Sequence, residues 1–375
     1  MLYLYNNYSL LRTCAELWKA LSICSVLFFI RGEVSVITIY DISRETGFSI
    51  ATVSKVINGY KGVNIKTRET IQKKIEELGY VPNSTARTLT TKRSWLIAVV
   101  LAVEGLWNGI VHPHYSQIIQ SFQKEIGSFG YDIIFLNPFM GERKLSGLEH
   151  CKYRNVDGIL LAVNSKFTDE VQDIIEGNIP MVSVETVYNG IPTVISDNVM
   201  SATQAMEHLY FLGHRKIAHL AGPLVSIAGR ERCEGYKMFL ESNGIDFQSK
   251  YLVEATDYSP QSGAEAFQVL LHQCWDDLPT AIYLAYDNYA ASVIEVLRNQ
   301  GFRVPKDISI VGNDDLPQAS YMTPGLTTVR QNREELGIKA AKLLQEQIEQ
   351  QKVSSIIAKV PTKLIVRQTT YRKYD

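Results

Sequence analysis

The sequence has few cysteines, and their spacing argues against the common structural uses of cysteine. The 375 residues contain five, none in a C-x-x-C pair: Cys14, Cys24, Cys151, Cys233 and Cys274. An odd number of widely spaced cysteines indicates neither a disulfide framework nor a zinc site. We therefore expect reduced, mostly buried thiols in a cytoplasmic protein that carries no metal and no cofactor.

The chain also lacks the short motifs of common enzyme classes. It contains no G-x-S-x-G, P-loop, H-E-x-x-H or glycine-rich dinucleotide fingerprint. Asp314 and Asp315 are adjacent carboxylates, but neighbours on a strand point to opposite faces and do not form a catalytic pair. His112 and His114 have no carboxylate or cysteine companion, so we expect no metal site there. These absences predict a binding protein rather than an enzyme.

No apolar run is long enough to span a bilayer, so we expect no membrane partner. The run 20–30, ALSICSVLFFI, is about half the ~20 residues that a membrane helix needs. As a signal peptide it has weak positive flanks and no small-x-small cleavage site before Arg31. We interpret residues 1–35 as an extension translated from too early a start, with a native GUG start at Val34 or Val36.

Charge is unevenly distributed along the chain. The formal net charge is −1, yet residues 36–94 carry ten Lys and Arg against five Asp and Glu, a net of +5. Residues 95–375 carry a net of −7. A basic segment beside an acidic body is typical of a nucleic-acid-binding head joined to a domain that avoids phosphates. Small basic helical modules also serve other partners, so charge alone does not identify the ligand.

The basic segment opens with IYDISRETGFSIATVSKVIN, residues 39–58. Helical spacing predicts one helix over 39–46, capped by Thr38, and a second over 50–58, capped by Ser49. Gly47 supplies the backbone freedom for the turn between them. A third helix is expected from Asn64 to Gly79, with apolar residues that complete a small core. Two helices across such a turn predict a helix-turn-helix, whose second helix fits the DNA major groove.

A polar segment, residues 83–94, separates this head from the rest. Its threonines and serines are poor helix formers, which favours a linker that is at most marginally helical by itself. Leu89 is a lone leucine in this segment. It is either an ordinary surface residue or an apolar wedge that inserts between base pairs in the minor groove.

From Trp95 onward, apolar runs alternate with helical periodicity. The run 96–103 is continuously apolar, which is typical of a strand buried on both faces of a parallel sheet. Further strands are expected at 133–136, 158–163, 181–184, 217–221, 281–285 and 308–312, and a β-like segment at the end. Helices are expected at 115–130, 145–154, 168–176, 201–212, 229–243, 289–300 and 333–351. Regular alternation predicts a doubly wound α/β body, and the number of strands requires two lobes joined by more than one crossing.

These segments together resemble the lactose-repressor/galactose-repressor family. The match runs from VITIYDISRETGFSIATVSKVINGYKGVN through NVDGILLAV, HLYFLGHRKIAHLAGP, VPKDISIVGNDD and PGLTTVRQN, covering Val36 to about Thr370. The resemblance implies a helix-turn-helix head at 36–82, a hinge at 83–94 and a periplasmic-binding-protein-like body at 95–375. It further implies an N-lobe of about 95–196 and 333–358, and a C-lobe of about 197–332 and 359–371.

The resemblance also assigns DNA-binding roles. It implies that a homodimer or a tetramer binds a near-palindromic double-stranded operator. Ile50, Ala51 and Lys55 match positions that contact base edges, and Leu89 matches the intercalating leucine of the hinge. Residues suited to phosphate or hinge contacts are Tyr40, Ser49, Thr52, Ser54, Asn58, Asn83 and Ala86.

A small effector, a sugar or a sugar derivative, is expected between the lobes. By the family's pattern, the ligand-holding residues are Arg232, Asp287 and Asp314, the two acids at strand ends. Further candidates are Asn164 and Glu185, which follow strands and could equally have ordinary loop roles, Gln331 near the lobe crossover, and Tyr115, which stands where the sequence departs from the family and could stack on the ligand. The sequence departs from the family at Arg333, where relatives often have an aromatic residue. An arginine there suits an anionic or strongly hydroxylated ligand.

Three functions are compatible with these features. The first is a repressor of sugar-utilisation genes controlled by a small effector. The second is a global catabolite regulator whose co-effector is a phosphoprotein. The third, an exported sugar-binding transport component, is disfavoured by the helix-turn-helix that precedes the sugar-binding body.

Overall fold

The computed structural model of the chain describes residues 37–81, 88, 93–102, 113–136, 139–140, 143–163, 169–350 and 355–373. The chain divides into two compact units, one ending at Lys92 and one beginning at Arg93. Expectations about residues 1–35, and about most of the segment 83–94, lie outside the described residues. Within the described part, no helix is both long enough and apolar enough to cross a membrane.

The first unit contains the predicted helix-turn-helix. Its helices are α2 (Ile39–Thr46), α3 (Ile50–Ile57) and α4 (Ile65–Leu78). The Asp41 carboxylate accepts hydrogen bonds from the Thr38 backbone N–H at 2.9 Å and from the Thr38 hydroxyl at 2.7 Å, closing the first turn of α2. Gly47 ends α2 with φ 73°, and the Ser49 hydroxyl accepts from the Thr52 N–H at 3.2 Å. The predicted three helices of the head are confirmed.

One small core holds the three helices together. Ile42, Val53, Val56 and Ile71 are buried in a single cluster, with Ile75 and Leu78 of α4 packed against it. This is the packing that the apolar spacing predicted. Because so few side chains form the core, each contributes a large share of the stability of the head.

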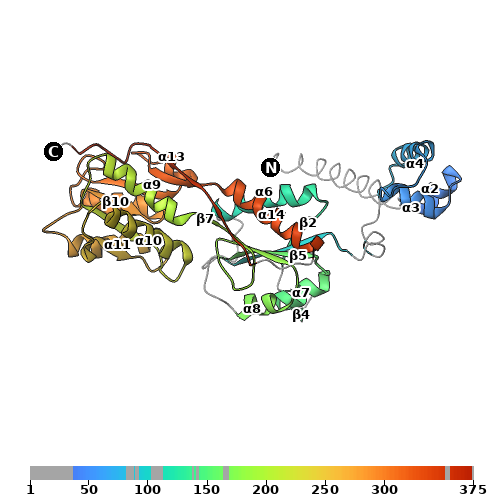
Figure 1. Ribbon diagram of the computed structural model, residues 1–375, viewed down its shortest axis with the longest axis horizontal. Coiled ribbons are helices and arrows are strands. Elements are labelled where there is room, and N and C mark those ends of the chain that lie inside the picture. Colours follow the sequence, from blue (N-terminus) through green and yellow to red (C-terminus); the bar gives the residue numbers. More distant parts are fainter. Residues whose placement is uncertain are drawn as a thin grey trace, which may run out of the picture. The chain divides into compact units, whose positions relative to one another are not determined.

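The second unit has two lobes, each built on a six-stranded sheet (Figure 1). The N-lobe sheet has the order β13-β7-β6-β5-β1-β2, and all its neighbouring strands are parallel. Its strands are β1 (Leu96–Ala102), β2 (Asp132–Phe135), β5 (Gly158–Val163), β6 (Met181–Val184), β7 (Thr193–Ser196) and β13 (Ile357–Val360). Around it lie the helices α6 (Pro113–Ser128), α7 (Gly147–Arg154), α8 (Asp169–Glu176) and α14 (Arg333–Gln350). A short hairpin of β3 (Phe139–Met140) and β4 (Arg143–Lys144) is also present.

The C-lobe sheet has the order β14-β12-β11-β10-β8-β9, parallel except for β14. Its strands are β8 (Ile217–Ala221), β9 (Leu252–Glu254), β10 (Ala281–Leu284), β11 (Ser309–Asp314), β12 (Thr327–Gln331) and β14 (Thr362–Ile365). Its helices are α9 (Asn198–Phe211), α10 (Ile227–Ser242), α11 (Pro260–Gln273), α12 (Asn288–Asn299) and α13 (Pro317–Tyr321), with a 3-10 turn, η2, at Ser249–Tyr251. The predicted fold class, a helical head with a two-lobed α/β body, is confirmed.

The chain passes between the lobes at three places. The passages lie between β7 and α9, between β12 and α14, and at Pro361 between β13 and β14. The strand β13 extends the N-lobe sheet to Val360, two residues beyond the 358 expected from the resemblance. Ser196, Gln331 and Arg333 therefore lie at passages, where one side chain can reach both lobes.

Sequence periodicity missed several short elements. The strands β7, β12 and β13 have four or five residues each, and β12 reads TTVRQ, with little apolar content. Such segments become strands because a neighbouring strand completes their hydrogen bonds, which is a tertiary effect. The helix α11 was also missed, although Ser259 caps it and Pro260 opens it.

Replacing Ile71 with alanine should destabilise the head selectively. Its side chain is fully buried in the head core, and truncating a core isoleucine to alanine costs about 2–5 kcal/mol. The matched control is Ile65→Ala on the same helix, because Ile65 is 73% exposed. Hydrogen exchange of the α2–α4 amides should accelerate for Ile71→Ala alone. Equal exchange in the two variants would contradict the assigned core.

Candidate functional site

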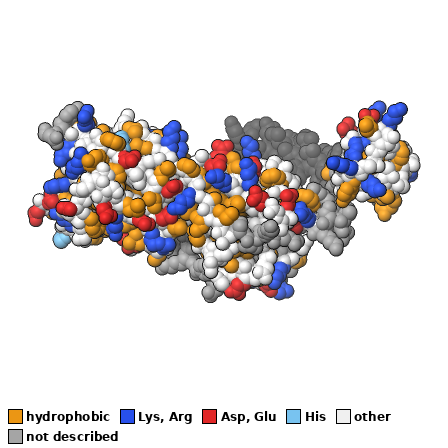
Figure 2. Space-filling view, viewed as in Figure 1, with side chains coloured by type: hydrophobic (Ala, Val, Ile, Leu, Met, Phe, Trp, Pro, Cys, Tyr) orange, Lys and Arg blue, Asp and Glu red, His pale blue; other side chains and the backbone are white. Residues whose placement is uncertain are grey.

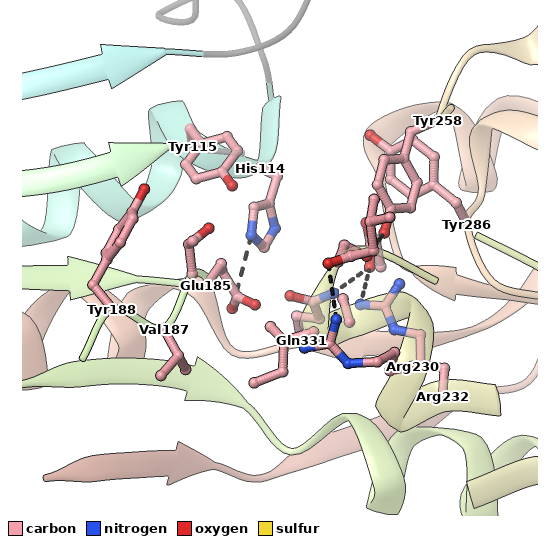
Figure 3. A pocket seen from close by; sticks show the side chains of 16 residues that line it. His114, Tyr115, Glu185, Val187, Tyr188, Arg230, Arg232, Tyr258, Tyr286 and Gln331 are labelled. Atoms are coloured by element: carbon pink, nitrogen blue, oxygen red, sulfur yellow. Dashed lines mark hydrogen bonds and ion pairs between the residues drawn. The ribbon is translucent and has the colours of Figure 1, made fainter. Parts of the chain in front are cut away.

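A cavity of about 280 Å³ opens between the two lobes. The N-lobe lines it with His114, Tyr115, Glu185 and Tyr188, and the C-lobe with Arg232, Tyr258, Tyr286, Asp314 and Gln331, among others. Several of these residues lie at or just after the carboxyl ends of parallel strands. That edge is the usual ligand position in open α/β sheets. Figure 3 shows the labelled side chains of the two lobes facing one another across the cavity.

Arg232 is fixed on α10 by three hydrogen bonds within the protein. Its Nε donates to Asn198 Oδ1 at 3.0 Å, its Nη1 to the Ala285 carbonyl at 2.6 Å, and its Nη2 to Asp314 Oδ1 at 3.3 Å. The side chain is almost fully buried, and a buried charge is tolerable only with such partners. A guanidinium has five N–H groups, so two remain for a ligand in the cavity that it lines.

Asp314 connects several groups at the end of β11. Its Oδ1 accepts from Arg232, from Asn313 Nδ2 at 2.8 Å and from Gln331 Nε2. Its backbone φ is 111°, a conformation that residues other than glycine rarely adopt. The next residue, Asp315, points away and accepts from Arg330 and Arg367 at 2.7 and 2.6 Å. The two carboxylates therefore face different surroundings, as expected, although Asp315 lies after the end of β11 and is not a strand neighbour of Asp314.

Glu185 is the acidic group on the N-lobe wall of the cavity. Its Oε1 accepts from the Ser196 N–H at 3.1 Å and from the Ser196 hydroxyl at 2.8 Å. The side chain is only 8% exposed, and burial raises its pKa to about 7, although Ser196 and Arg232 favour the charged form. The Ser196 hydroxyl also lies 2.8 Å from Gln331 Oε1, and its single hydrogen can be donated to either of these two acceptors. This contact links the N-lobe to the C-lobe.

The remaining wall is aromatic and apolar. Tyr115, Tyr188, Tyr258 and Tyr286 line the cavity, together with Val187, Val225, Ile227 and Ala228. The two cavity arginines, Arg230 and Arg232, balance the two acids, Glu185 and Asp314, in formal charge. Fixed hydrogen-bonding groups beside an apolar face suit a small hydroxylated ligand.

The structure brings five of the predicted effector residues together at this cavity: Tyr115, Glu185, Arg232, Asp314 and Gln331. Asn164 lies outside the described residues. Asp287 is buried and is not among the lining residues, because its carboxylate accepts from the Thr328 hydroxyl at 2.6 Å and from the Leu316 N–H at 2.9 Å. Gly312 leaves the room for this arrangement, since a Cβ there would lie 2.2 Å from Asp287 Oδ1.

Sequence reasoning missed other lining residues, notably His114, Tyr188, Tyr258 and Tyr286. Tyr286 carried a usable signal, because it lies two residues after the end of β10 and strand ends face the cavity. Tyr258 lies between β9 and α11, a helix that the periodicity did not reveal. Arg333, expected near the ligand, instead donates to protein atoms, including the carbonyls of Asp314 and Asp315.

The head presents the predicted DNA-reading residues at its surface. Tyr40 is 67% and Ile50 41% exposed, and Ala51 and Lys55 are also exposed. Lys and Arg side chains are prominent on the face of the head seen in Figure 2, whereas both signs are interspersed over the face of the body in view.

Several polar residues of the head also have local partners. The Ser49 and Thr52 hydroxyls lie 2.9 Å apart, and Asn58 Nδ2 donates to the Ser54 carbonyl at 2.9 Å. These contacts fix the side chains at the two ends of α3. Asn83, Ala86 and Leu89, which were predicted to reach the DNA from the hinge, lie outside the described residues.

Glu185→Gln should change stability in a pH-dependent manner. The unfolded chain releases the Glu185 proton near pH 4.5 and the folded chain near pH 7, so the wild type loses stability as pH rises through this interval. At about 1.4 kcal/mol per pKa unit, the wild type loses roughly 3 kcal/mol of stability. The glutamine side chain of the variant does not titrate, so the variant does not lose this stability. Urea unfolding at pH 5 and pH 8 measures the free energy of unfolding of both proteins. We expect Glu185→Gln to gain stability relative to the wild type at the higher pH. The exposed Glu265→Gln is the control, and an equal gain there would contradict the assignment.

Comparison with known proteins gives matches to both parts of the chain. Residues 38–83 match the model described as bacterial regulatory proteins, lacI family, and residues 206–370 match a periplasmic binding protein-like domain. Catabolite control protein A of Priestia megaterium is 32% identical over 89% of this chain and 99% of its own length. The transcriptional regulator CelR of Thermobifida fusca is 32% identical over 88% of this chain and 98% of its own length.

Solved structures agree with these matches. A lac repressor dimer bound to operator and an anti-inducer is 29% identical, covers 89% of this chain and 99% of that chain, and superposes with a TM-score of 0.69. A complex of CelR with cellobiose has 30% identity, 89% and 99% coverage, and a TM-score of 0.64. The chain has a helix-turn-helix head and a two-lobed body, and it covers these relatives almost completely. It therefore belongs to the lacI family of bacterial regulatory proteins.

Proposed function

We propose that this regulator is a sequence-specific DNA-binding repressor whose operator affinity is set by a small, neutral, sugar-type effector in the interlobe cavity. The observation that carries the proposal is the cavity itself. Its fixed Arg232, Asp314, Gln331 and Glu185 come from both lobes and surround a space of small-molecule size. A ligand that contacts both walls favours one arrangement of the lobes, and such a differential affinity can shift a two-state equilibrium.

The DNA-reading half of the proposal depends on the exposed face of α3. Lys55 can donate to guanine acceptors in the major groove, and Ile50 and Ala51 can contact thymine methyl groups. We propose that Tyr40, Ser49, Thr52, Ser54 and Asn58 contact phosphates, and that Asn83, Ala86 and Leu89 act from the hinge in the minor groove. Two copies of the head would read the two halves of a near-palindromic operator, which requires a homodimer.

The effector class follows from the balance of polar groups. Formal charges cancel within the cavity, and the buried carboxylates accept hydroxyl hydrogens more readily than they tolerate a phosphate. Relatives include a CelR structure named as a cellobiose complex and a Ribose operon repressor. These names agree with a neutral sugar as the effector of this chain.

A second candidate is a global catabolite regulator with a phosphoprotein co-effector. Similarity to Catabolite control protein A favours the role in catabolite control, whereas the phosphoprotein co-effector is part of the proposal alone. A transport role has no such support, since the chain belongs to a family of regulatory proteins. Binding of a small sugar without any partner protein would favour the first candidate over the second.

The proposal is tested by operator selection followed by ligand screening. The purified full-length chain should enrich near-palindromic sites from a random duplex library at moderate salt. A thermal-shift panel should contain ribose, cellobiose, ribose 5-phosphate and glucose 6-phosphate, because a ligand stabilises the state that it binds. We expect a neutral sugar to raise the melting temperature and to alter operator affinity. Enrichment of no site would overturn the DNA-binding half.

Arg232→Gln should abolish the sugar-induced thermal shift. The variant keeps the size of the side chain approximately but removes the fixed charge-assisted donors at the C-lobe wall. Operator affinity without sugar should remain within about threefold of wild type. The matched control is Arg303→Gln, because Arg303 is exposed and forms its ion pair with Asp307 away from the cavity. A full thermal shift in Arg232→Gln would contradict the assigned contact.

Leu89→Gln should weaken operator binding by about tenfold or more and reduce the DNA bend. A polar side chain cannot act as an apolar wedge between base pairs. The two base pairs that the wedge separates would therefore lose the apolar contact that offsets their unstacking. Fluorescence anisotropy measures the affinity, and energy transfer between labelled duplex ends measures the bend. Binding to a scrambled duplex serves as the control and should change little. Unchanged operator affinity with an unchanged bend would show that Leu89 is an ordinary surface residue.

A further inference from the structure

Arg333 is a buried arginine that contacts both lobes without lining the cavity. It begins α14, where the chain returns to the N-lobe, and is 7% exposed. Its Nη2 donates to the Asp314 carbonyl, and its Nη1 approaches the Asp315 carbonyl at 3.5 Å. On the N-lobe side, Nη1 donates to Gln117 Oε1 at 3.2 Å and Nε donates to His114 Nδ1 at 3.3 Å.

The contact with His114 determines which imidazole nitrogen carries the proton. An arginine N–H is always a donor, so His114 Nδ1 must act as an acceptor and is unprotonated. In the neutral imidazole the proton then resides on Nε2. The sequence gives no indication of this, because the two residues are 219 positions apart.

His114 Nε2 lies 3.9 Å from Glu185 Oε1, and both residues line the cavity. Figure 3 shows the two side chains facing one another on the N-lobe wall. At this separation the atoms form no direct hydrogen bond, whereas one oxygen atom can lie within hydrogen-bond reach of both. A ligand hydroxyl in that position would accept from His114 Nε2–H and donate to the Glu185 carboxylate.

We propose that Arg333 is a positioning residue that fixes His114 in the Nε2–H form, so that His114 and Glu185 together bind one hydroxyl group of the effector. The inference deepens the proposed function and rests on it for the identity of the ligand as a hydroxylated molecule. The same arginine holds the Asp314 carbonyl, and so it positions polar groups on both walls. A single substitution outside the cavity should therefore alter recognition at two places within it.

The first test reads the tautomer directly and needs no ligand. Solid-state ¹⁵N NMR of the full-length chain, labelled only at histidine, distinguishes protonated from unprotonated ring nitrogens at pH 8. The His114 signals are assigned by their loss in His114→Gln. We expect an unprotonated Nδ1 in the wild type and a mixture of tautomers in Arg333→Gln. A protonated Nδ1 in the wild type would overturn the proposal.

The second test connects the tautomer to recognition. The panel sugars ribose and cellobiose are titrated into wild type, Arg333→Gln, and Gln117→Ala as the matched control. The control removes another Arg333 partner but leaves the contact with His114. We expect about tenfold weaker sugar binding for Arg333→Gln and less than threefold for Gln117→Ala. Equal loss in the two variants would indicate a merely structural arginine and would overturn the proposal.

The two tests fail in distinguishable ways. If the wild-type chain selects no operator and binds no sugar, the proposed function fails, whereas the tautomer is still measured. If the wild type binds a sugar and Arg333→Gln binds it equally well, the positioning role fails while the proposed function stands.

Discussion

The arrangement of the interlobe cavity depends on Asp314, which holds groups from both lobes. Its carboxylate accepts from Arg232 and Gln331, and its carbonyl accepts from Arg333. A buried carboxylate loses several kcal/mol of hydration, and only well-placed donors offset that loss. The donors to the carboxylate come from α10 and β12, and the donor to the carbonyl is the first residue of α14. The polar groups of this one residue therefore fix the relative positions of three elements.

The backbone at the cavity is organised for the site rather than for its own stability. Glu185 and Asp314 both adopt positive φ angles, 62° and 111°, although neither is glycine. Such conformations cost about 1–3 kcal/mol each and persist where surrounding contacts hold them. Here Ser196 holds the Glu185 carboxylate and Arg333 holds the Asp314 carbonyl. The cost is compatible with function because it directs two acids from opposite lobes into one cavity.

The sequence predicted elements whose signals are local. Thr38, Gly47 and Ser49 define the ends of two helices through contacts within a few residues. The sequence correctly predicted all three as helix ends. The strand-end rule placed Glu185 and Asp314 at the cavity for a similar reason, since parallel strands share one carboxyl edge. The same rule selected Asp287, but Thr328, 41 residues away, and the Leu316 N–H bind that carboxylate within the C-lobe.

The sequence by itself determined the head, the alternation of strands and helices, and the family, because caps, turns and periodicity act over a few neighbouring residues. Tertiary structure decided which polar side chains reach the cavity. Arg333 contacts Asp314 and His114 rather than the cavity, and His114 lies 219 residues away in the chain. A buried charge takes the partners that the folded chain brings to it, and no short-range pattern records which partners those are.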